Sequence, residues 1–258
     1  DSLENKEISA ALRSLETEVI RGFRYTLAEV SVTSVISYSN AADVDRVLDA
    51  VEKAVGHDDW HVRHTATHFL RCFQGAHQFV FSRNHSVGTM QLIASVLADD
   101  RREVSSAAMS ALTGILAASQ ADEVAVMVKK YIAIASKSKT KRPKKNGKTV
   151  APDSYDDVDQ DKERIRAHNQ KTSVFFLCAA ILAQPYDTPL YVPAALSAIS
   201  KHSFERNAPL GVRDIVKKCC AEYKKTHMSD DWERHRSVFT QDQLEALEDV
   251  VSTPHYYA

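Results

Sequence analysis

The sequence predicts an all-α fold: a HEAT- or armadillo-like solenoid of antiparallel helix pairs. Composition is the first reason, because 7 glycines and 7 prolines in 258 residues are few for a fold with many tight β-turns. The second reason is an apolar periodicity near 3.6 residues that recurs in pairs along the chain. The third is the spacing of those pairs, about 40 residues.

Each pair is defined by two apolar helix faces. The first helices are expected around 44–55, 87–97, 124–132 and 191–199. The second helices align on Val62, Val104, Ile165 and Val212, at spacings of 42, 61 and 47 residues. A low-complexity insert at 137–160 accounts for the long middle spacing, which shortens to 37 residues without it. The corrected period lies in the HEAT and armadillo range.

Local signals mark where the second helices begin. An aspartate ahead of the helix, as in Asp58-Asp59 and Asp99-Asp100, suits an N-cap, because its carboxylate accepts the unpaired amide protons of the first turn. The pairs Val62-Arg63 and Val212-Arg213 match the HEAT pattern of a buried aliphatic residue followed by a basic one. This pattern is complete in two of the four pairs, so it supports a helix-pair solenoid more strongly than HEAT repeats in particular.

The last helical segment is expected to cap the solenoid, since a terminal repeat has no neighbour to cover its apolar face. Its start is marked by Thr240 and Gln243, which have the spacing of a capping box. The sequence therefore divides into a repeat region, 1–251, and a protruding tail, 252–258. The apolar residues of the cap are Trp232, Phe239, Leu244, Leu247 and Val251.

The chain starts at Asp1 without an initiator methionine, on an amphipathic run. We therefore expect it to be part of a longer polypeptide.

Charge and motifs exclude several classes of function. The formal net charge is −1, which gives no overall attraction to nucleic acid or to an anionic membrane. No apolar stretch reaches the length of a membrane span, and the first residues given do not show the pattern of a signal peptide. The four cysteines lack metal-binding spacing and are expected to be reduced thiols. The glycines are too dispersed for a Rossmann or Walker A loop, so no cofactor is expected.

A histidine cluster gives the one candidate metal site. His64 and His68 are four residues apart on one helix face, close to His61, but the glutamate of an HExxH motif is missing. Partly exposed polar residues at a repeat junction are the simpler interpretation. We therefore expect no metal and no catalytic activity, and a metal-dependent enzyme remains the weaker alternative.

The insert at 137–160 is expected to be disordered. Its first half holds seven basic residues between 137 and 148, and an acidic stretch follows. A solvated linker is the simplest interpretation. A nuclear-import signal around Lys141, Arg142, Lys144 and Lys145 is the alternative, with location in nucleus and cytoplasm. Direct nucleic-acid binding is less favoured, because stacking aromatic residues are missing.

The chain ends in a hydrophobic residue, a tyrosine and any residue, which is the HbYX signature of proteasome activators: Tyr256, Tyr257 and Ala258. A match this short arises easily by chance, so the surrounding sequence has to support it. In order, several segments resemble the carboxy-terminal region of the proteasome activator complex subunit 4 family, the Blm-ten type. The resemblance is densest from about residue 165 to the end. It is carried by PYDTP at 185–189, YKKTH at 223–227, FTQDQL at 239–244 and STPHYYA at 252–258.

The resemblance implies a very large, monomeric, α-helical dome that caps the 20S proteasome without catalysing proteolysis. The tail would enter a pocket between neighbouring subunits of the α-ring and promote gate opening. The Ala258 carboxylate can meet a lysine of that pocket, while Tyr257 and Tyr256 supply a hydrogen bond and apolar contact. A HEAT scaffold or a nuclear-transport-type binding module is the alternative, and it would not need a free carboxy terminus.

The family is also linked to ubiquitin-independent turnover of acetylated histones, through a bromodomain-like stretch within about 60–150. Here this chain departs from the family pattern. The animal members carry Asn-Phe where this sequence has Ser119 and Gln120. An asparagine amide is the usual donor to an acetyl carbonyl, so Ser119 and Gln120 would have to replace it. Acetylated histone tails are therefore a candidate partner that these two residues would have to recognise.

Overall fold

The computed structural model describes residues 41–136, 156–205 and 208–251, and within these ranges it is all α-helical. They contain ten α-helices, one short 3-10 helix and no strand, which confirms the predicted all-α class. The amphipathic run near Asp1 lies outside the described residues. The helices are α2 (Ala41–Val55), α3 (Trp60–His77), α4 (Arg83–Ser95), α5 (Arg102–Ala118), α6 (Ala121–Ala135), α7 (Asp156–Leu182), α8 (Val192–Ser200), η1 (Lys201–Ser203), α9 (Val212–Met228), α10 (Trp232–Arg236) and α11 (Gln241–Val251).

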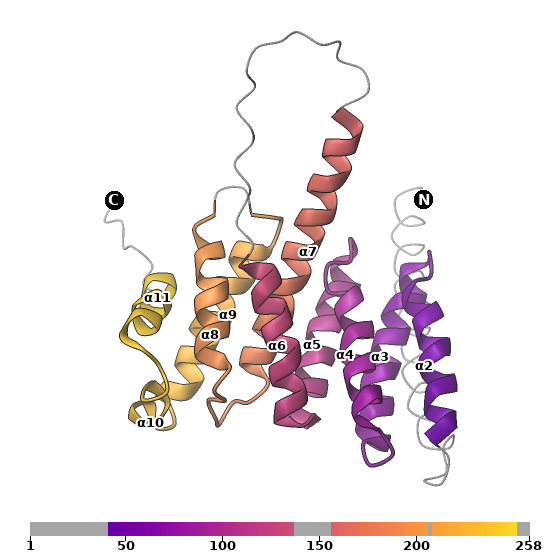
Figure 1. Cartoon of the computed structure of the whole chain (residues 1–258), viewed down its shortest axis with the longest axis horizontal. Coiled ribbons are helices and arrows are strands. Elements are labelled where there is room, and N and C mark those ends of the chain that lie inside the picture. Colours follow the sequence, from indigo (N-terminus) through magenta and orange to yellow (C-terminus); the bar gives the residue numbers. More distant parts are fainter. Residues whose placement is uncertain (1–40, 137–155, 206–207, 252–258) are drawn as a thin grey trace, which may run out of the picture.

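The helices stand side by side in two layers, as in a solenoid (Figure 1). In the first layer α2 packs against α4, α4 against α6 and α6 against α8. In the second layer α3 packs against α5, α5 against α7 and α7 against α9. Helix α11 covers α8 and α9 at the carboxy-terminal end, and its own Leu247 and Val250 are buried. The predicted helix pairs and their terminal cap are therefore present.

The second helices begin close to the positions that the repeat spacing predicts. Helices α3 and α5 start two residues before Val62 and Val104, and α9 starts at Val212 itself. Val104 and Val212 are fully buried in the core, whereas Val62 is only partly buried. Helix α7 is the exception, because it starts at Asp156, nine residues before Ile165.

The prediction for the insert was too long at its carboxy-terminal end. Residues 156–160 belong to α7 rather than to an irregular segment. The physical reason is that negative charge stabilises the amino-terminal end of a helix, so the acidic residues from Asp156 onward can form the first turn of α7. Residues 137–155 lie outside the described part of the chain.

The aspartate N-cap is confirmed at α3 and wrong at α5. Asp59 caps α3, with its Oδ1 accepting the backbone N–H of His61 at 2.8 Å. Helix α5 is instead preceded by Arg101 without a side-chain cap, and α9 is preceded by Gly211. Asp99, which the sequence placed near the start of α5, is engaged by Arg63 and by the Arg101 backbone N–H.

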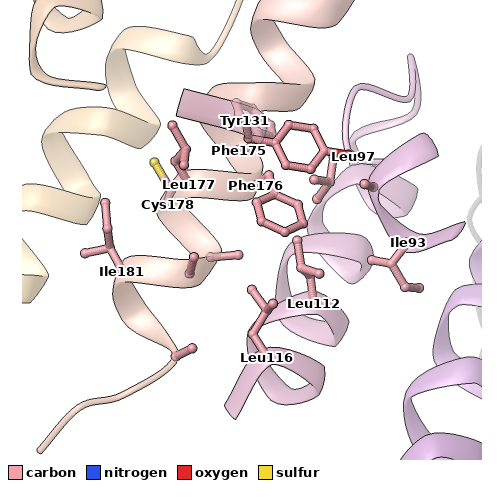
Figure 2. Close-up of a cluster of buried hydrophobic side chains, with 14 of the residues drawn as sticks. Ile93, Leu97, Leu112, Leu116, Tyr131, Phe175, Phe176, Leu177, Cys178 and Ile181 are labelled. Carbon is pink, nitrogen blue, oxygen red and sulfur yellow. The ribbon is translucent and has the colours of Figure 1, made fainter. Parts of the chain in front are cut away.

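Helix α7 forms the centre of the hydrophobic core (Figure 2). Phe176 is fully buried and stacks on Tyr131 of α6, with the ring centroids 4.0 Å apart. Leu112 and Leu116 of α5 are buried in the same cluster. Because α7 contacts α5, α6, α8 and α9, its buried face joins the amino-terminal and carboxy-terminal halves of the solenoid.

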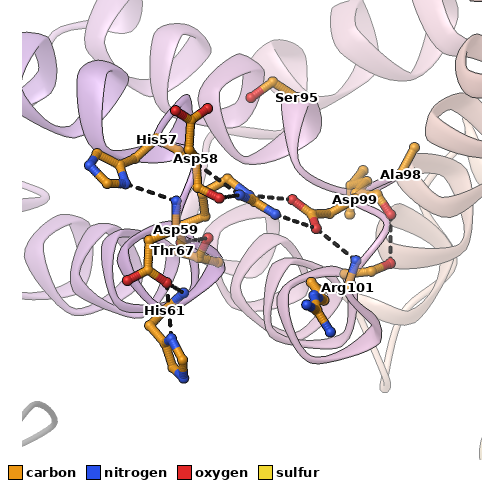
Figure 3. A network of polar contacts seen from close by, with 12 residues as sticks. His57, Asp58, Asp59, His61, Thr67, Ser95, Ala98, Asp99 and Arg101 are labelled. Carbon is orange, nitrogen blue, oxygen red and sulfur yellow. Dashed lines mark hydrogen bonds and ion pairs between the residues drawn. The ribbon is translucent and has the colours of Figure 1, made fainter.

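A network of polar contacts connects successive repeats near the loops between the helices (Figure 3). Arg63 of α3 donates from Nε and Nη2 to the two carboxylate oxygens of Asp99, at 2.7 and 3.0 Å. Its Nη1 donates to the backbone carbonyls of His57 and Asp58. The Nζ of Lys171 in α7 donates to the backbone carbonyl of Asp99 at 3.3 Å. The loop between α4 and α5, which contains Asp99, therefore contacts both α3 and α7. The basic residue of the Val62-Arg63 pair therefore links neighbouring repeats.

Candidate functional site

The predicted tail, Tyr256, Tyr257 and Ala258, lies outside the described residues. The structure describes the helices that precede it, α8 to α11, which we call the tail platform. Helix α11 ends at Val251, directly before the tail. Its start is fixed by the predicted capping box: Gln243 Oε1 accepts the Thr240 backbone N–H at 2.9 Å, and Thr240 Oγ1 accepts the Gln243 N–H at 3.4 Å. Lys224 of α9 forms an ion pair with Glu248 of α11.

A buried hydrogen-bond network fixes the connection from α7 to α8 against α9 and α10. Thr188 Oγ1 lies 2.9 Å from the Tyr223 hydroxyl and 2.9 Å from His235 Nδ1. His235 Nε2 lies 3.0 Å from a carboxylate oxygen of Asp230. All but Asp230 are buried, and burial raises the pKa of Tyr223 to about 12 in spite of the opposing hydrogen bond to Thr188. Tyr223 therefore stays a neutral hydroxyl at physiological pH.

His227 adds a second connection to the same segment. Its ring stacks on Tyr223 with centroids 4.0 Å apart and meets His235 edge-on at 4.5 Å. Its two nitrogens lie 2.8 Å from the Tyr223 carbonyl oxygen and 3.2 Å from the Asp187 carbonyl oxygen. His227 therefore links α9 to the segment between α7 and α8 and to α10. Sequence reasoning missed this network, although PYDTP and YKKTH, which supply most of it, were noted for their resemblance.

Ser119 and Gln120, the two residues proposed for acetyl-lysine recognition, form the short connection between α5 and α6. Ser119 is the C-cap of α5, and its hydroxyl donates to the Ile115 carbonyl at 2.7 Å. Its oxygen lies 3.4 Å from the amide nitrogen of Gln74, which donates to it. Gln120 is exposed and precedes α6 without a side-chain cap. The hydroxyl proton of Ser119 is therefore already used within its own helix, and Gln120 has the more accessible side chain.

The candidate metal face makes local contacts. His61 Nδ1 lies 2.9 Å from Asp59 Oδ1, and its ring stacks on Trp60. His68 Nδ1 lies 3.7 Å from the Cys72 sulfur. Within residues 41–136, 156–205 and 208–251, no group of three or more histidine, cysteine or acidic side chains has the geometry to hold a metal ion.

The basic residues Lys141, Arg142, Lys144 and Lys145 lie outside the described part of the chain. The four cysteines are free thiols, as expected, and Cys72 is the most accessible of them. Burial, and to a smaller extent the charge of the neighbouring Cys219, raise the pKa of the Cys220 thiol. None of the described helices is both long and apolar enough to cross a membrane.

The carboxy-terminal platform coincides with a family match. Residues 167–258 match the model of the proteasome activator complex subunit 4-like carboxy-terminal family. That range begins within α7 and includes α8 to α11, the Thr188 network and the tail. It agrees with the prediction that the resemblance is densest from about residue 165 onward.

Individual relatives extend the similarity further toward the amino terminus. Proteasome activator complex subunit 4 of Homo sapiens is 31% identical over 217 residues, which are 83% of this chain and 11% of the human protein. The Bos taurus protein of the same name is 30% identical over the same shares. Proteasome activator subunit 4 of Arabidopsis thaliana is 25% identical over 256 residues, 93% of this chain and 13% of the plant protein. The chain thus spans only a small part of these relatives' length, and it belongs to the proteasome activator complex subunit 4 family.

Proposed function

We propose that this chain is the carboxy-terminal part of a proteasome activator that docks on the α-ring of the 20S core particle and promotes gate opening. The observation that carries the proposal is that the family match runs through to residue 258 and includes the HbYX tail. The protein would act by docking, and the core particle would supply the proteolytic chemistry.

The platform supports this role because it fixes where the tail begins. A tail that starts from an anchored helix has a higher effective concentration near its pocket than a free peptide. Helix α11 is anchored by its capping box, by the Lys224–Glu248 ion pair and by its packing on α8 and α9. Pro254 restricts the backbone of the tail and lowers the entropy lost on docking.

Gate opening follows if the tail binds the open α-ring better than the closed one, because a ligand shifts an equilibrium only by its differential affinity. Tyr257 would fill a groove between α subunits while its hydroxyl hydrogen-bonds, and the Ala258 carboxylate would meet a cation. Three residues give little affinity alone, so a wider docking surface must act together with the tail.

The test is stimulation of peptide hydrolysis by purified 20S particles, using the full-length protein with and without residues 256–258. We expect deletion to abolish most of the stimulation, and Tyr257→Phe or one extra residue after Ala258 to reduce it. Tyr186→Phe is the matched control, because Tyr186 is 76% exposed and lies far from the tail in the sequence. Unchanged stimulation and unchanged association after the deletion would exclude the tail as the docking element.

Recognition of acetylated histone tails is a second role that we propose for this region, and it now depends mainly on Gln120. Its side chain is exposed, whereas the Ser119 hydroxyl proton is bonded within α5. Titration of acetylated and unmodified histone-tail peptides against the chain tests it. Selective binding of the acetylated peptide that is lost in Gln120→Ala would support it; equal, negligible binding of both peptides would exclude it.

We also propose that the protein enters the nucleus through the basic segment around Lys141 and Lys145. Dense positive charge beside Pro143 is what import receptors bind as an extended peptide. Replacing Lys141, Arg142, Lys144 and Lys145 by alanine should move a fluorescent fusion of the protein from nucleus to cytoplasm. An unchanged distribution would contradict the proposal.

A further inference from the structure

A groove of about 860 Å³ runs between α2 and α4 in the first layer of the solenoid. Gly88 lies in the α4 wall of this groove, and a Cβ added there would meet no atom within 4 Å. The missing side chain therefore helps to keep the groove open. Its lining consists of Asp45, Leu48, Asp49, Glu52, Val55, Gly56, Ser82, Asn84, His85, Gly88, Gln91, Leu92 and Ser95.

The α2 wall of the groove is acidic. Asp45, Asp49 and Glu52 are spaced i, i+4 and i+7, which places them on one stripe of the helix. The lining has no lysine or arginine among the residues that the structure describes. Two arginines of these helices are engaged elsewhere: Arg83 pairs with Asp122 of α6 at 2.8 Å, and Arg46 pairs with Asp43 at 3.5 Å.

His85 does not neutralise this wall. Its Nδ1 accepts the Ser82 backbone N–H at 3.2 Å in the capping box of α4. The proton of the neutral ring is therefore on Nε2, which donates to Asp45 Oδ1 at 2.9 Å. A neutral donor orients the carboxylate and leaves its negative charge in place. Asp49 and Glu52 are exposed on the same stripe.

The floor of the groove is apolar, and this decides which cation fits. Leu48 and Leu92 are partly exposed beside the buried Val55. Lysine and arginine side chains lie with their methylene stems on such surface while the charged head meets a carboxylate. The carboxylates are separated along α2 by about 6 and about 4.5 Å of helix rise. Alternate side chains of an extended peptide are about 6.6 Å apart, close to the first of these intervals, and the long flexible stems of lysine and arginine can span the difference at the second.

We propose that the α2–α4 groove binds an extended lysine- and arginine-rich peptide segment of a partner protein. The acidic stripe recognises the charged heads, the apolar floor takes the stems, and the polar α4 wall, with Asn84 and Gln91, offers hydrogen bonds to the peptide backbone. This site lies outside the tail platform and does not depend on proteasome docking. Its interaction is electrostatic and should weaken with salt.

The test is fluorescence anisotropy with the full 258-residue chain and a labelled twelve-residue peptide in which lysine or arginine alternates with serine or alanine. We expect saturable binding that weakens between about 50 and about 150 mM salt. Removing two carboxylates in the Asp49→Asn/Glu52→Gln variant should weaken binding at least about fivefold. Gly88→Leu, which keeps every carboxylate and fills the groove, should weaken binding as well.

The matched control is Asp214→Asn/Glu222→Gln, which removes two exposed carboxylates from α9 and changes the net charge equally. It should leave the affinity within twofold. Equal loss in both double variants would show attraction by net charge only and overturn the proposal. A further variant replaces Lys141, Arg142, Lys144 and Lys145 by alanine. If this variant binds the peptide at least tenfold more tightly, the groove is occupied by this chain's own basic segment, and the proposal of a partner protein is overturned.

Discussion

At the scale of single residues, Arg63 shows how one side chain connects two repeats. Its guanidinium makes four hydrogen bonds, two to the Asp99 carboxylate and two to backbone carbonyls. The side chains of Arg63 and Asp99 are 17% and 8% exposed, so the pair is protected from most solvent screening. A planar fork suits this site in a way that a lysine ammonium does not.

Arg63→Lys should therefore lower the free energy of unfolding by about 1–3 kcal/mol, although the charge is conserved. Urea unfolding followed by circular dichroism measures this. Arg46→Lys is the control, because Arg46 is 83% exposed beside Asp43 and should change stability by less than about 0.5 kcal/mol. Equal effects of the two substitutions would contradict the bridging role of Arg63.

The same pair predicts a dependence of stability on pH. Burial by itself raises the pKa of Asp99, but hydrogen bonds from Arg63 and the Arg101 backbone N–H, with the Arg63 charge, outweigh it and leave the pKa below the ordinary 3.8. Because the folded pKa lies below the unfolded one, the contribution is present above pH 3.8 and is lost as pH falls through the folded value. Between pH 7 and 3, wild type should lose more free energy of unfolding than Asp99→Asn. Parallel pH profiles would contradict this.

At the scale of elements, two glycines predict opposite effects of the same substitution. Gly211 precedes α9 with φ at +81°, in the left-handed region that an L side chain rarely adopts. Gly88 lies inside α4 with open space around it. Gly211→Ala should destabilise the protein by about 1 kcal/mol, and Gly88→Ala should stabilise it by about 0.5–1 kcal/mol. Thermal unfolding of both variants checks this; a shift in the same direction for both would be inconsistent with it.

The elements also show where local signals were sufficient. Thr240 and Gln243 form the predicted capping box because both partners lie within one turn. Asp99 was a poor guide to the start of α5, because Arg63, 36 residues earlier in the chain, competes for its carboxylate. An N-cap is reliable from sequence only when no distant cation reaches it.

At the scale of the whole molecule, the two layers make α7 the element on which both halves depend. Phe176 is fully buried among α5, α6 and α7 side chains, whereas Val250 is a buried residue of the terminal helix α11. Phe176→Ala should cost about 3–5 kcal/mol, because it leaves a cavity at a site packed from several sides. Val250→Ala should cost less, since a terminal helix can adjust. Denaturant unfolding of both variants measures the difference, and a larger loss for Val250→Ala would argue against α7 as the centre.

The sequence by itself determined the helix pairs, their period of about 40 residues and the capped carboxy-terminal end, because apolar periodicity and capping are local patterns. The resemblance at 185–189 and 239–244 pointed to the family. Only the tertiary structure decided that Thr188, Tyr223 and His235 meet, and that the acidic stripe of α2 faces the open side of α4. Those contacts join residues 35 and 47 positions apart, and no local pattern specifies which surfaces come together when helices pack.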